Sequence, residues 1–220
     1  MGIKVIITGS TGMVGEGVLL ECLQNSDVEK VLILNRKSYS ISDPKLEEIL
    51  IKDFFDLNSI SEKVKDFDAC FFCAGISSVG MNEADYTKVT YDMTLSVAEF
   101  LSKQNPDLVF NYISGQSTDS SENGKIMWAR VKGKTENDLL KLPFKAVYNF
   151  RPGFMEPVKG QKNIKPFFKI LLLLTPIFKL ILPKSVCTLH EVGRAMVNSV
   201  TKGYYKNILE VADIKSLSKK

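Results

Sequence analysis

A glycine-rich turn close to the first residue constrains the fold of this chain more than any other feature. Residues 4–8 are a short run of mostly β-branched residues, which predicts a strand, and an apolar helical pattern extends from 12 to about 23. The turn between them reads Gly9-Ser10-Thr11-Gly12-Met13-Val14-Gly15. Glycines at this spacing allow a tight turn, a close approach of backbone N–H groups to a pyrophosphate, and close packing of a helix on a strand.

A phosphate at this turn would lie at the positive end of the helix dipole, where backbone N–H groups have no partner within the helix. Strand, turn and helix together therefore predict a dinucleotide-binding site that uses residues 9–15. The alternative is a turn that serves the fold alone.

Strand and helix patterns alternate along the rest of the chain. Apolar segments predict further strands at 31–34, 49–51, 67–74, 108–113 and 146–150, with helices at about 83–102 and 125–142. Continuous apolar strands imply burial on both faces, and their alternation with helices implies right-handed crossovers. We therefore expect an α/β fold, a Rossmann-type doubly wound parallel sheet with a small C-terminal helical cap. It forms a single domain over 1–220, with the dinucleotide-binding core at about 1–153.

The remaining residues, about 154–220, are expected to form the cap, a helix at about 189–200 and a last strand near 208–211. His190 and Glu191 open that helix, and we interpret them as a structural start rather than a catalytic pair.

The end of the second strand indicates which dinucleotide binds. An acid there accepts hydrogen bonds from the adenosine ribose of NAD, whereas a base pairs with the 2′-phosphate of NADP. This chain has Asn35-Arg36-Lys37 and no acid before Asp43. Arg36 can pair with a phosphate and stack on adenine, so NADP is favoured over NAD. The alternative is that Arg36 and Lys37 are solvated loop charges.

The cysteines, the single histidine and the charge distribution exclude other classes. Cys70 and Cys73 lie in an apolar strand, where a redox pair is not expected. One histidine rules out a multi-histidine metal site, so no metal is expected. Six lysines and no acid occur in 157–190, so the net charge of +4 is local and does not indicate nucleic-acid binding. Reduced thiols and the lack of a secretory signal predict a cytoplasmic protein.

The sequence Thr8-Gly9-x-x-Gly12-x-x-Gly15 with this alternation resembles the short-chain dehydrogenase/reductase superfamily over nearly the whole chain. The resemblance is to its extended and atypical branches, which are NAD-dependent epimerase/dehydratase-like. More narrowly, the chain resembles small bacterial proteins related to the Tat-interacting oxidoreductase-like group.

That resemblance implies roles for residues at the ends of later strands. Asp53 and Phe54 resemble the pair whose acid meets the adenine amino group, and the turn Cys73-Ala74-Gly75 would lie beneath the cofactor. Ser114 stands where the family has its fifth-strand serine. Pro152 and Phe154, in Arg-Pro-Gly-Phe, would border the nicotinamide.

The superfamily's catalytic Tyr-x-x-x-Lys is replaced here by Trp128-Ala129-Arg130-Val131-Lys132. Trp128 and Lys132 project from one helix face, and Lys132 can hold the nicotinamide ribose hydroxyls. An indole cannot replace the phenol, because its N–H is a donor that does not titrate in water's range. Trp128 could simply fill space, Lys132 could be an exposed helix lysine, and Ser114 could be a strand-end cap. Candidate proton donors are Ser114, water or one of three tyrosines, Tyr86, Tyr91 and Tyr112.

Residues 167–183 form a basic, apolar segment. It is shorter than the about 20 apolar residues of a membrane span and is interrupted by lysines and a proline, which disfavours a span. The segment could be a lid over the substrate pocket, a subunit contact or a helix on an anionic membrane surface. A lid predicts a small-molecule substrate with an apolar or anionic part.

The sequence therefore predicts an NADP(H)-binding, atypical short-chain dehydrogenase-like protein, an oxidoreductase or epimerase-like enzyme with Lys132 and Ser114 as its candidate catalytic residues. The alternative is a non-catalytic NADP(H)-binding regulator or assembly factor, with peripheral membrane contact through 167–183.

Overall fold

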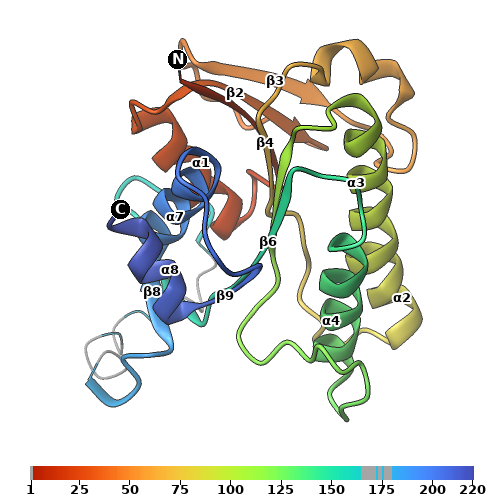
Figure 1. Ribbon diagram of the computed structural model, residues 1–220, viewed down its shortest axis with the longest axis vertical. Coiled ribbons are helices and arrows are strands. Elements are labelled where there is room, and N and C mark those ends of the chain that lie inside the picture. Colours follow the sequence, from red (N-terminus) through yellow and green to blue (C-terminus); the bar gives the residue numbers. More distant parts are fainter. Residues whose placement is uncertain (1, 165–171, 173–174, 176–179) are drawn as a thin grey trace.

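The first predicted strand lies inside a parallel sheet. A computed structural model describes residues 2–164, 172, 175 and 180–220. In it, β1 (Ile3–Thr8) pairs with β2 (Val28–Asn35) on one side and β4 (Ala69–Phe72) on the other. The seven strands lie in the order β3-β2-β1-β4-β5-β6-β9, with every pair parallel (Figure 1). The direction of winding thus reverses between β1 and β4, and ligands of such sheets bind at that point.

The other strands of this sheet are β3 (Leu46–Leu50), β5 (Val109–Ile113), β6 (Ala146–Arg151) and β9 (Ile208–Glu210). A separate parallel pair comprises β7 (Phe154–Glu156) and β8 (Val186–Thr188). The helices are α1 (Met13–Gln24), η1 (Asn58–Val64), α2 (Glu83–Thr87), η2 (Lys88–Asp92), α3 (Met93–Gln104), α4 (Met127–Leu139), α7 (Leu189–Thr201) and α8 (Val211–Ser218).

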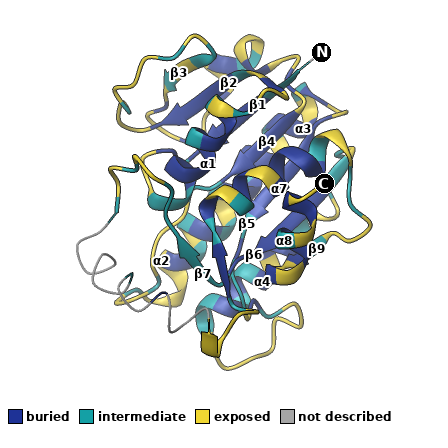
Figure 2. Cartoon of the chain, turned by 90° about the vertical axis from the view of Figure 1, so that its left-hand side faces the viewer, coloured by how far each residue is buried: buried dark blue, intermediate teal, exposed yellow. Residues whose placement is uncertain are grey.

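Helices cover both faces of the sheet, as the continuous apolar strands predict. One core packs α1, α7 and α8 on one face, and the other packs η1, α3 and α4 on the opposite face (Figures 1 and 2). All four residues of β4 are buried. The prediction of a Rossmann-type doubly wound parallel sheet is confirmed.

The helix predicted over 83–102 is interrupted. Between α2 and α3 the chain makes one π-helical turn, η2, which the apolar pattern does not reveal. Val89 in this turn and Met93 directly after it line a cavity described below. A π turn inserts a residue into the helix and re-aims the side chains that follow it.

Helices α7 and α8, near the C-terminus, complete the layer of helices that packs with α1 on one face of the sheet. Leu189 of α7 lies so close to α1 that a Cβ atom on Gly17 would be 2.8 Å from it. The expected strand near 208–211 ends at Glu210, because the Glu210 and Asp213 side chains reciprocally cap α8. That helix was not predicted.

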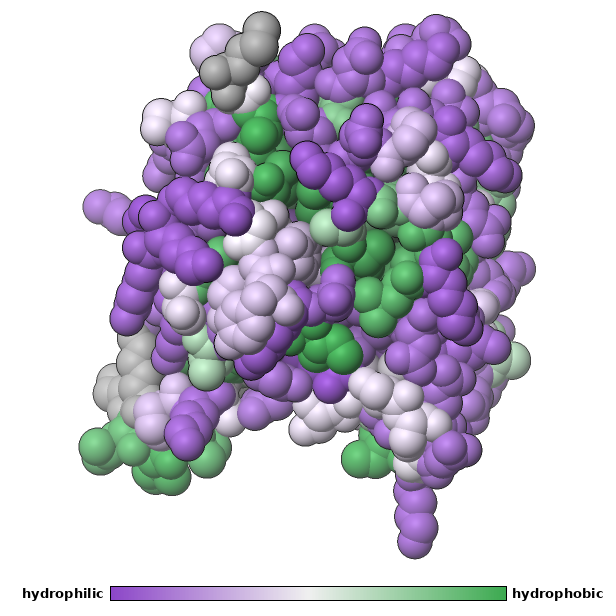
Figure 3. Space-filling view, in the orientation of Figure 1, coloured by the Kyte–Doolittle hydropathy of each residue, from purple (hydrophilic) through white to green (hydrophobic). Residues whose placement is uncertain are grey.

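Most of the basic, apolar segment 167–183 lies outside the described residues. At its end, Leu180, Ile181 and Leu182 expose 82%, 66% and 52% of their surface. Figure 3 shows hydrophobic atoms gathered at this corner, where the chain re-enters the described part. No helix in the described ranges has the length and apolar character needed to cross a bilayer.

Candidate functional site

The three glycines of the first turn differ in how much space their surroundings leave for a side chain. Gly9 has a φ of +71°, and a Cβ atom there would lie 2.7 Å from the Ala74 backbone. A Cβ atom on Gly15 would lie 2.2 Å from the Gly9 carbonyl oxygen. Gly12 donates its N–H to that oxygen at 2.9 Å, but its own Cβ position meets nothing closer than 3.3 Å. Gly9 and Gly15 are therefore required by backbone packing, whereas Gly12 leaves room for a ligand.

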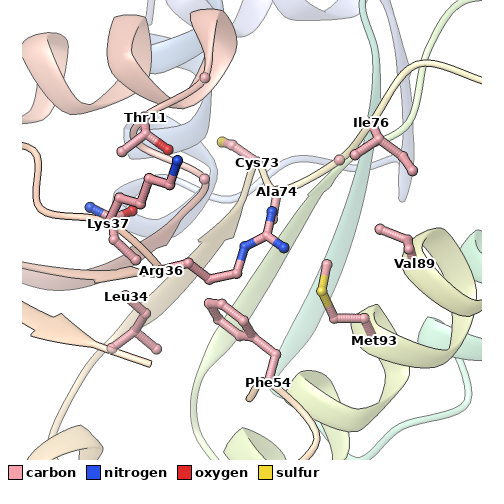
Figure 4. A pocket seen from close by; sticks show the side chains of 14 residues that line it. Thr11, Leu34, Arg36, Lys37, Phe54, Cys73, Ala74, Ile76, Val89 and Met93 are labelled. Atoms are coloured by element: carbon pink, nitrogen blue, oxygen red, sulfur yellow. The ribbon is translucent and has the colours of Figure 1, made fainter. Parts of the chain in front are cut away.

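A cavity of about 570 Å³ opens at this turn. No side chain caps the first turn of α1, so its N–H groups are available to an anion there. Figure 4 shows the cavity from close by. Its lining consists of Gly9, Thr11, Gly12, Leu34, Asn35, Arg36, Lys37, Phe54, Cys73, Ala74, Gly75, Ile76, Val89 and Met93.

Arg36 and Lys37 form the charged wall of this cavity. Arg36 stretches across it between Phe54 and the Cys73–Ala74 turn, and Lys37 points towards Thr11 (Figure 4). The described lining residues include no aspartate or glutamate. The cavity is therefore suited to an anionic ligand.

The carboxylate of Glu48, which no sequence motif marked, anchors the end of β2 through hydrogen bonds. Buried Ser10 donates to Asn35 Oδ1 at 2.9 Å, and Asn35 donates to Glu48 Oε1 at 3.0 Å. Glu48 also accepts hydrogen bonds from Ser38 Oγ and the Tyr39 N–H. Burial opposes ionisation of Glu48, but these hydrogen bonds outweigh it and lower the pKa of its carboxyl. Ser10 and Asn35 thus position the loop that carries Arg36.

A second overlooked carboxylate, Glu16, is fully buried in the first turn of α1. It accepts hydrogen bonds from the Tyr39 hydroxyl at 2.8 Å and from the backbone N–H groups of Lys162 and Asn163. Since these groups come from two different loops, the hydrogen bonds of Glu16 connect both loops to the first turn of α1, next to the glycine turn.

A second cavity, of about 430 Å³, continues along the carboxyl edge of the sheet. The two cavities share Cys73, Ala74, Gly75 and Ile76, so they form one cleft. The second is otherwise lined by Val14, Ile113, Ser114, Gly115, Gln116, Lys132, Pro152, Gly153 and Met155.

Five predicted site residues lie outside both linings: Ser10, Met13, Gly15, Asp53 and Phe154. Asp53 is exposed, and its carboxylate accepts the Phe55 N–H at 2.9 Å instead of pointing into the cavity. Met13 offers its carbonyl oxygen to Gln161. In contrast, five residues line the cleft although no sequence motif marked them: Ile76, Val89, Met93, Gln116 and Met155. Ile76, Met155 and Gln116 lie one or two residues after the predicted positions Gly75, Phe154 and Ser114, whereas Val89 and Met93 lie far from any of them.

Lys132 reaches the second cavity from α4. Its Nζ donates to the Ser114 carbonyl oxygen and lies 3.5 Å from that of Ile113, so it is fixed at the end of β5. Burial lowers the pKa of Lys132 to about 8, although Glu136, one turn further along, acts in the opposite direction.

Ser114 lines the second cavity, but its hydroxyl is engaged by a buried ion pair. Its hydroxyl donates to Glu136 Oε1 at 2.5 Å and lies 3.1 Å from the Phe150 carbonyl oxygen. Glu136 has no exposed surface and accepts hydrogen bonds from Arg151 Nε at 3.0 Å and Nη2 at 2.5 Å. Arg151 also bonds Ser120 and Glu210. The expected contact of Ser114 with a ligand is therefore made difficult by its own hydrogen bonds.

None of the three candidate tyrosines lines either cavity. Tyr86 and Tyr112 are both 2% exposed, and burial raises the pKa of each phenol. Tyr91 faces α4, where its hydroxyl donates to Asp138 at 2.7 Å. Burial, followed by this bond, raises the pKa of Tyr91 to about 12. The part of the cleft lining that the structure describes therefore contains no replacement phenol.

Trp128 lies half-buried one turn before Lys132. Its ring is 4.0 Å from the position of a Cβ atom on Gly115, beside the second cavity but outside its lining. The only tryptophan thus stands at the cleft without offering it a titratable proton.

Lys132→Met is expected to stabilise the ligand-free protein at pH 7 by about 1–2 kcal/mol, raising Tm by several degrees. Holding a lysine pKa at about 8 disfavours its charged form in the fold by roughly 3 kcal/mol, and losing the hydrogen bond to the Ser114 carbonyl oxygen offsets part of the gain from its removal. Thermal unfolding against pH measures this gain. Because the unfolded chain keeps its proton up to about pH 10.5, the gain should shrink as pH rises above 8.

Lys134→Met is the matched control for this stability effect, because Lys134 is an exposed lysine on the same helix. A Lys132→Met protein less stable than wild type at pH 7 would contradict the desolvation argument.

A model of the NAD-dependent epimerase/dehydratase family matches residues 5–135, more than half of the chain. The chain belongs to this family. It therefore has the NAD(P)-binding fold that the glycine turn predicts. The narrower resemblance to the Tat-interacting group stays a prediction.

The chain is also similar to curated proteins and to solved structures. Protein FMP52 of Meyerozyma guilliermondii is 25% identical over 154 residues, 69% of this chain and 65% of the relative, slightly under two thirds of its length. The ADP-L-glycero-D-manno-heptose-6-epimerase of Helicobacter pylori matches 99% of this chain and 82% of its own, with 16% identity and a TM-score of 0.69. MoeE5, solved with UDP-glucose and NAD, matches 98% and 80%, with 15% identity and a TM-score of 0.63. Identities this low between structures establish the fold alone.

The prediction of a cytoplasmic location is wrong. The FMP52 relatives from Meyerozyma guilliermondii, Scheffersomyces stipitis and Kluyveromyces lactis are named as mitochondrial proteins. Free cysteines, on which that prediction partly rested, do not distinguish the cytoplasm from the interior of an organelle.

Proposed function

We propose that this protein binds NADP(H) and transfers hydride to or from a small carbonyl or hydroxyl compound. The observation that carries the cofactor preference is the wall of the first cavity, where Arg36 and Lys37 are the charged residues and no described lining residue is acidic. A 2′-phosphate there would meet two cations. The nearest acid in the network, Glu48, already accepts three hydrogen bonds from Asn35, Ser38 and Tyr39.

The pyrophosphate would lie at Gly12 and the first turn of α1, and the nicotinamide would lie in the second cavity, beside Pro152. When bound, the cofactor supplies or accepts a hydride. Lys132 would hold the nicotinamide ribose hydroxyls, since its ammonium group is fixed at the end of β5 in the lining of the second cavity.

The substrate would share the second cavity with the nicotinamide. Ile113, Met155 and Ile76 offer apolar contacts, whereas Gln116 and Lys132 offer hydrogen-bond donors. This combination favours a compound with an apolar body and a carbonyl or anionic oxygen. Nucleotide sugars belong in the same screen, because MoeE5 was solved with UDP-glucose.

Arg36→Ala is expected to weaken NADPH binding by roughly 30-fold and NADH binding by less than about threefold. The loss corresponds to about 2 kcal/mol for charge-assisted hydrogen bonds to a phosphate. Titration with each cofactor, followed by quenching of Trp128 fluorescence, measures both affinities. Lys202→Ala, which removes an exposed lysine after α7, is the control. Equal weakening of NADPH and NADH would show that Arg36 does not contact a 2′-phosphate.

A second candidate is a non-catalytic NADP(H)-binding regulator or assembly factor. The absence of any tyrosine from the described lining of the cleft favours it, since the family's phenol has no replacement there. Turnover distinguishes the two: NADPH consumption with any member of an aldehyde, ketone and nucleotide-sugar panel supports the enzyme, and tight binding without consumption supports the regulator.

A further inference from the structure

The second cavity contains few groups that can exchange a proton. Among its described lining residues, Cys73, Ser114, Gln116 and Lys132 have side chains with a proton on sulfur, oxygen or nitrogen. A reaction that converts a carbonyl into an alcohol needs one proton at oxygen for each hydride at carbon. One of these four side chains, or water, must supply it.

Three of the four are poorly suited to the task. The Ser114 hydroxyl has one proton, which it donates to buried Glu136. Gln116 has an amide, which does not titrate in water, and its Nε2 donates to Ser185 Oγ at 2.9 Å. Burial raises the pKa of the Cys73 thiol to about 12.

Lys132 differs from the other three because its hydrogen bonds within the protein do not use all of its donors. An ammonium group has three N–H donors. The Ser114 carbonyl oxygen accepts one, and the Ile113 carbonyl oxygen, at 3.5 Å, is at best a weak acceptor for a second. Up to two N–H groups therefore remain in the cavity that Lys132 lines, one for a ribose hydroxyl and one for the substrate oxygen.

We propose that Lys132 is the acid–base group of this site and takes the place of the missing phenol. In the reducing direction, a C–H bond forms from the hydride, the carbonyl electron pair moves to oxygen, and that oxygen takes a proton from Lys132 Nζ. The neutral amine then regains a proton from water. In the oxidising direction, the neutral amine accepts the hydroxyl proton. This inference rests on the hydride transfer proposed above.

The charged groups around Lys132 are compatible with this role. Glu136, on the same helix, favours the ammonium form, and its carboxylate is paired with Arg151 of β6. Tyr112 of β5 and Cys73 after β4 stay neutral near pH 7, because burial raises both pKa values. With a pKa of about 8, Lys132 has both protonation states available near neutral pH, as a general acid and base requires.

The first test needs no substrate. Calorimetric titration with NADP⁺ at pH 8, in two buffers of different ionisation enthalpy, counts the protons released on binding. A positively charged nicotinamide ring next to Lys132 favours the neutral amine, so wild type should release up to about half a proton. Lys132→Arg keeps the charge and the ribose contacts but cannot lose a proton. It should bind NADP⁺ with no such release, whereas the control Lys134→Met should behave as wild type.

The second test follows the reduction of para-nitrobenzaldehyde and the rest of the carbonyl panel by NADPH. Wild-type turnover should fall as pH rises above 8, and oxidation of the corresponding alcohols by NADP⁺ should rise over the same range. Lys132→Arg should retain NADPH binding and lose about 100-fold or more in turnover.

The outcomes separate this inference from the proposed function. Equal proton release by wild type and Lys132→Arg overturns the assignment, because another group then titrates. Cofactor binding without turnover of any panel compound also overturns it and favours the regulator. If neither cofactor binds, the proposed function itself fails, and the role of Lys132 fails with it.

Discussion

Gly12→Val is expected to abolish NADPH binding, by more than about 100-fold, while the protein still folds. Gly12 is the N-cap of α1 with φ of −98° and ψ of 164°, a conformation that valine adopts readily. The new Cβ atom would be 3.3 Å from the Gly9 carbonyl oxygen, a contact that a small shift relieves. The side chain would, however, occupy the space where backbone N–H groups approach the pyrophosphate. Valine at an N-cap costs about 1 kcal/mol.

Fluorescence titration with NADPH and thermal unfolding followed by circular dichroism measure the two effects of Gly12→Val separately. Gly15→Ala is the contrasting variant. Its Cβ atom would lie 2.2 Å from the Gly9 carbonyl oxygen, so the helix would have to leave the strand and both folding and binding should be lost. A Gly12→Val protein that binds NADPH within tenfold of wild type would show that the pyrophosphate does not lie at this turn.

Arg151→Ala is expected to destabilise the fold by about 3–5 kcal/mol, the usual cost of leaving a buried charge without its partner. Glu136 has no exposed surface, and Arg151 supplies the cation that compensates its carboxylate. Urea unfolding of the wild type and the variant, followed by circular dichroism, measures this loss.

Two further variants make the Arg151 prediction specific. Arg130→Ala removes an ion pair with Glu83 in which the carboxylate is 53% exposed, so it should cost less than about 1 kcal/mol. The double variant Arg151→Met/Glu136→Leu removes both buried charges and should recover most of the stability. A cost for Arg151→Ala no larger than for Arg130→Ala would contradict the role of the buried pair.

Local patterns in the sequence predicted most of the scaffold. Runs of β-branched and apolar residues located β1, β2, β4, β5 and β6, and the turn chemistry of residues 9–15 located the switch point at which the cleft opens. These signals are local, because the residues that form a strand or a tight turn are neighbours in the chain. The π turn at 88–92 and helix α8 left no such pattern and were missed.

The predicted site residues also differ in how locally their positions are determined. Arg36 and Lys37 lie in the cavity wall because they directly follow β2, so their position is determined by one strand. Asp53 follows β3 by three residues, and the intervening loop carries its side chain away from the cavity. Spacing within one element is therefore a better guide than spacing across a loop.

The amino-acid sequence was sufficient for the sheet, the glycine turn and the two cations at the end of β2. The hydrogen bonds of Ser114, Glu136 and Lys132 depended on how α4 packs against β5 and β6. That packing turns the serine hydroxyl towards a buried carboxylate and places an ammonium group against two carbonyl oxygens. Hydrogen-bond direction and desolvation arise from groups that are distant in the chain but adjacent in space, and no local pattern of residues encodes them.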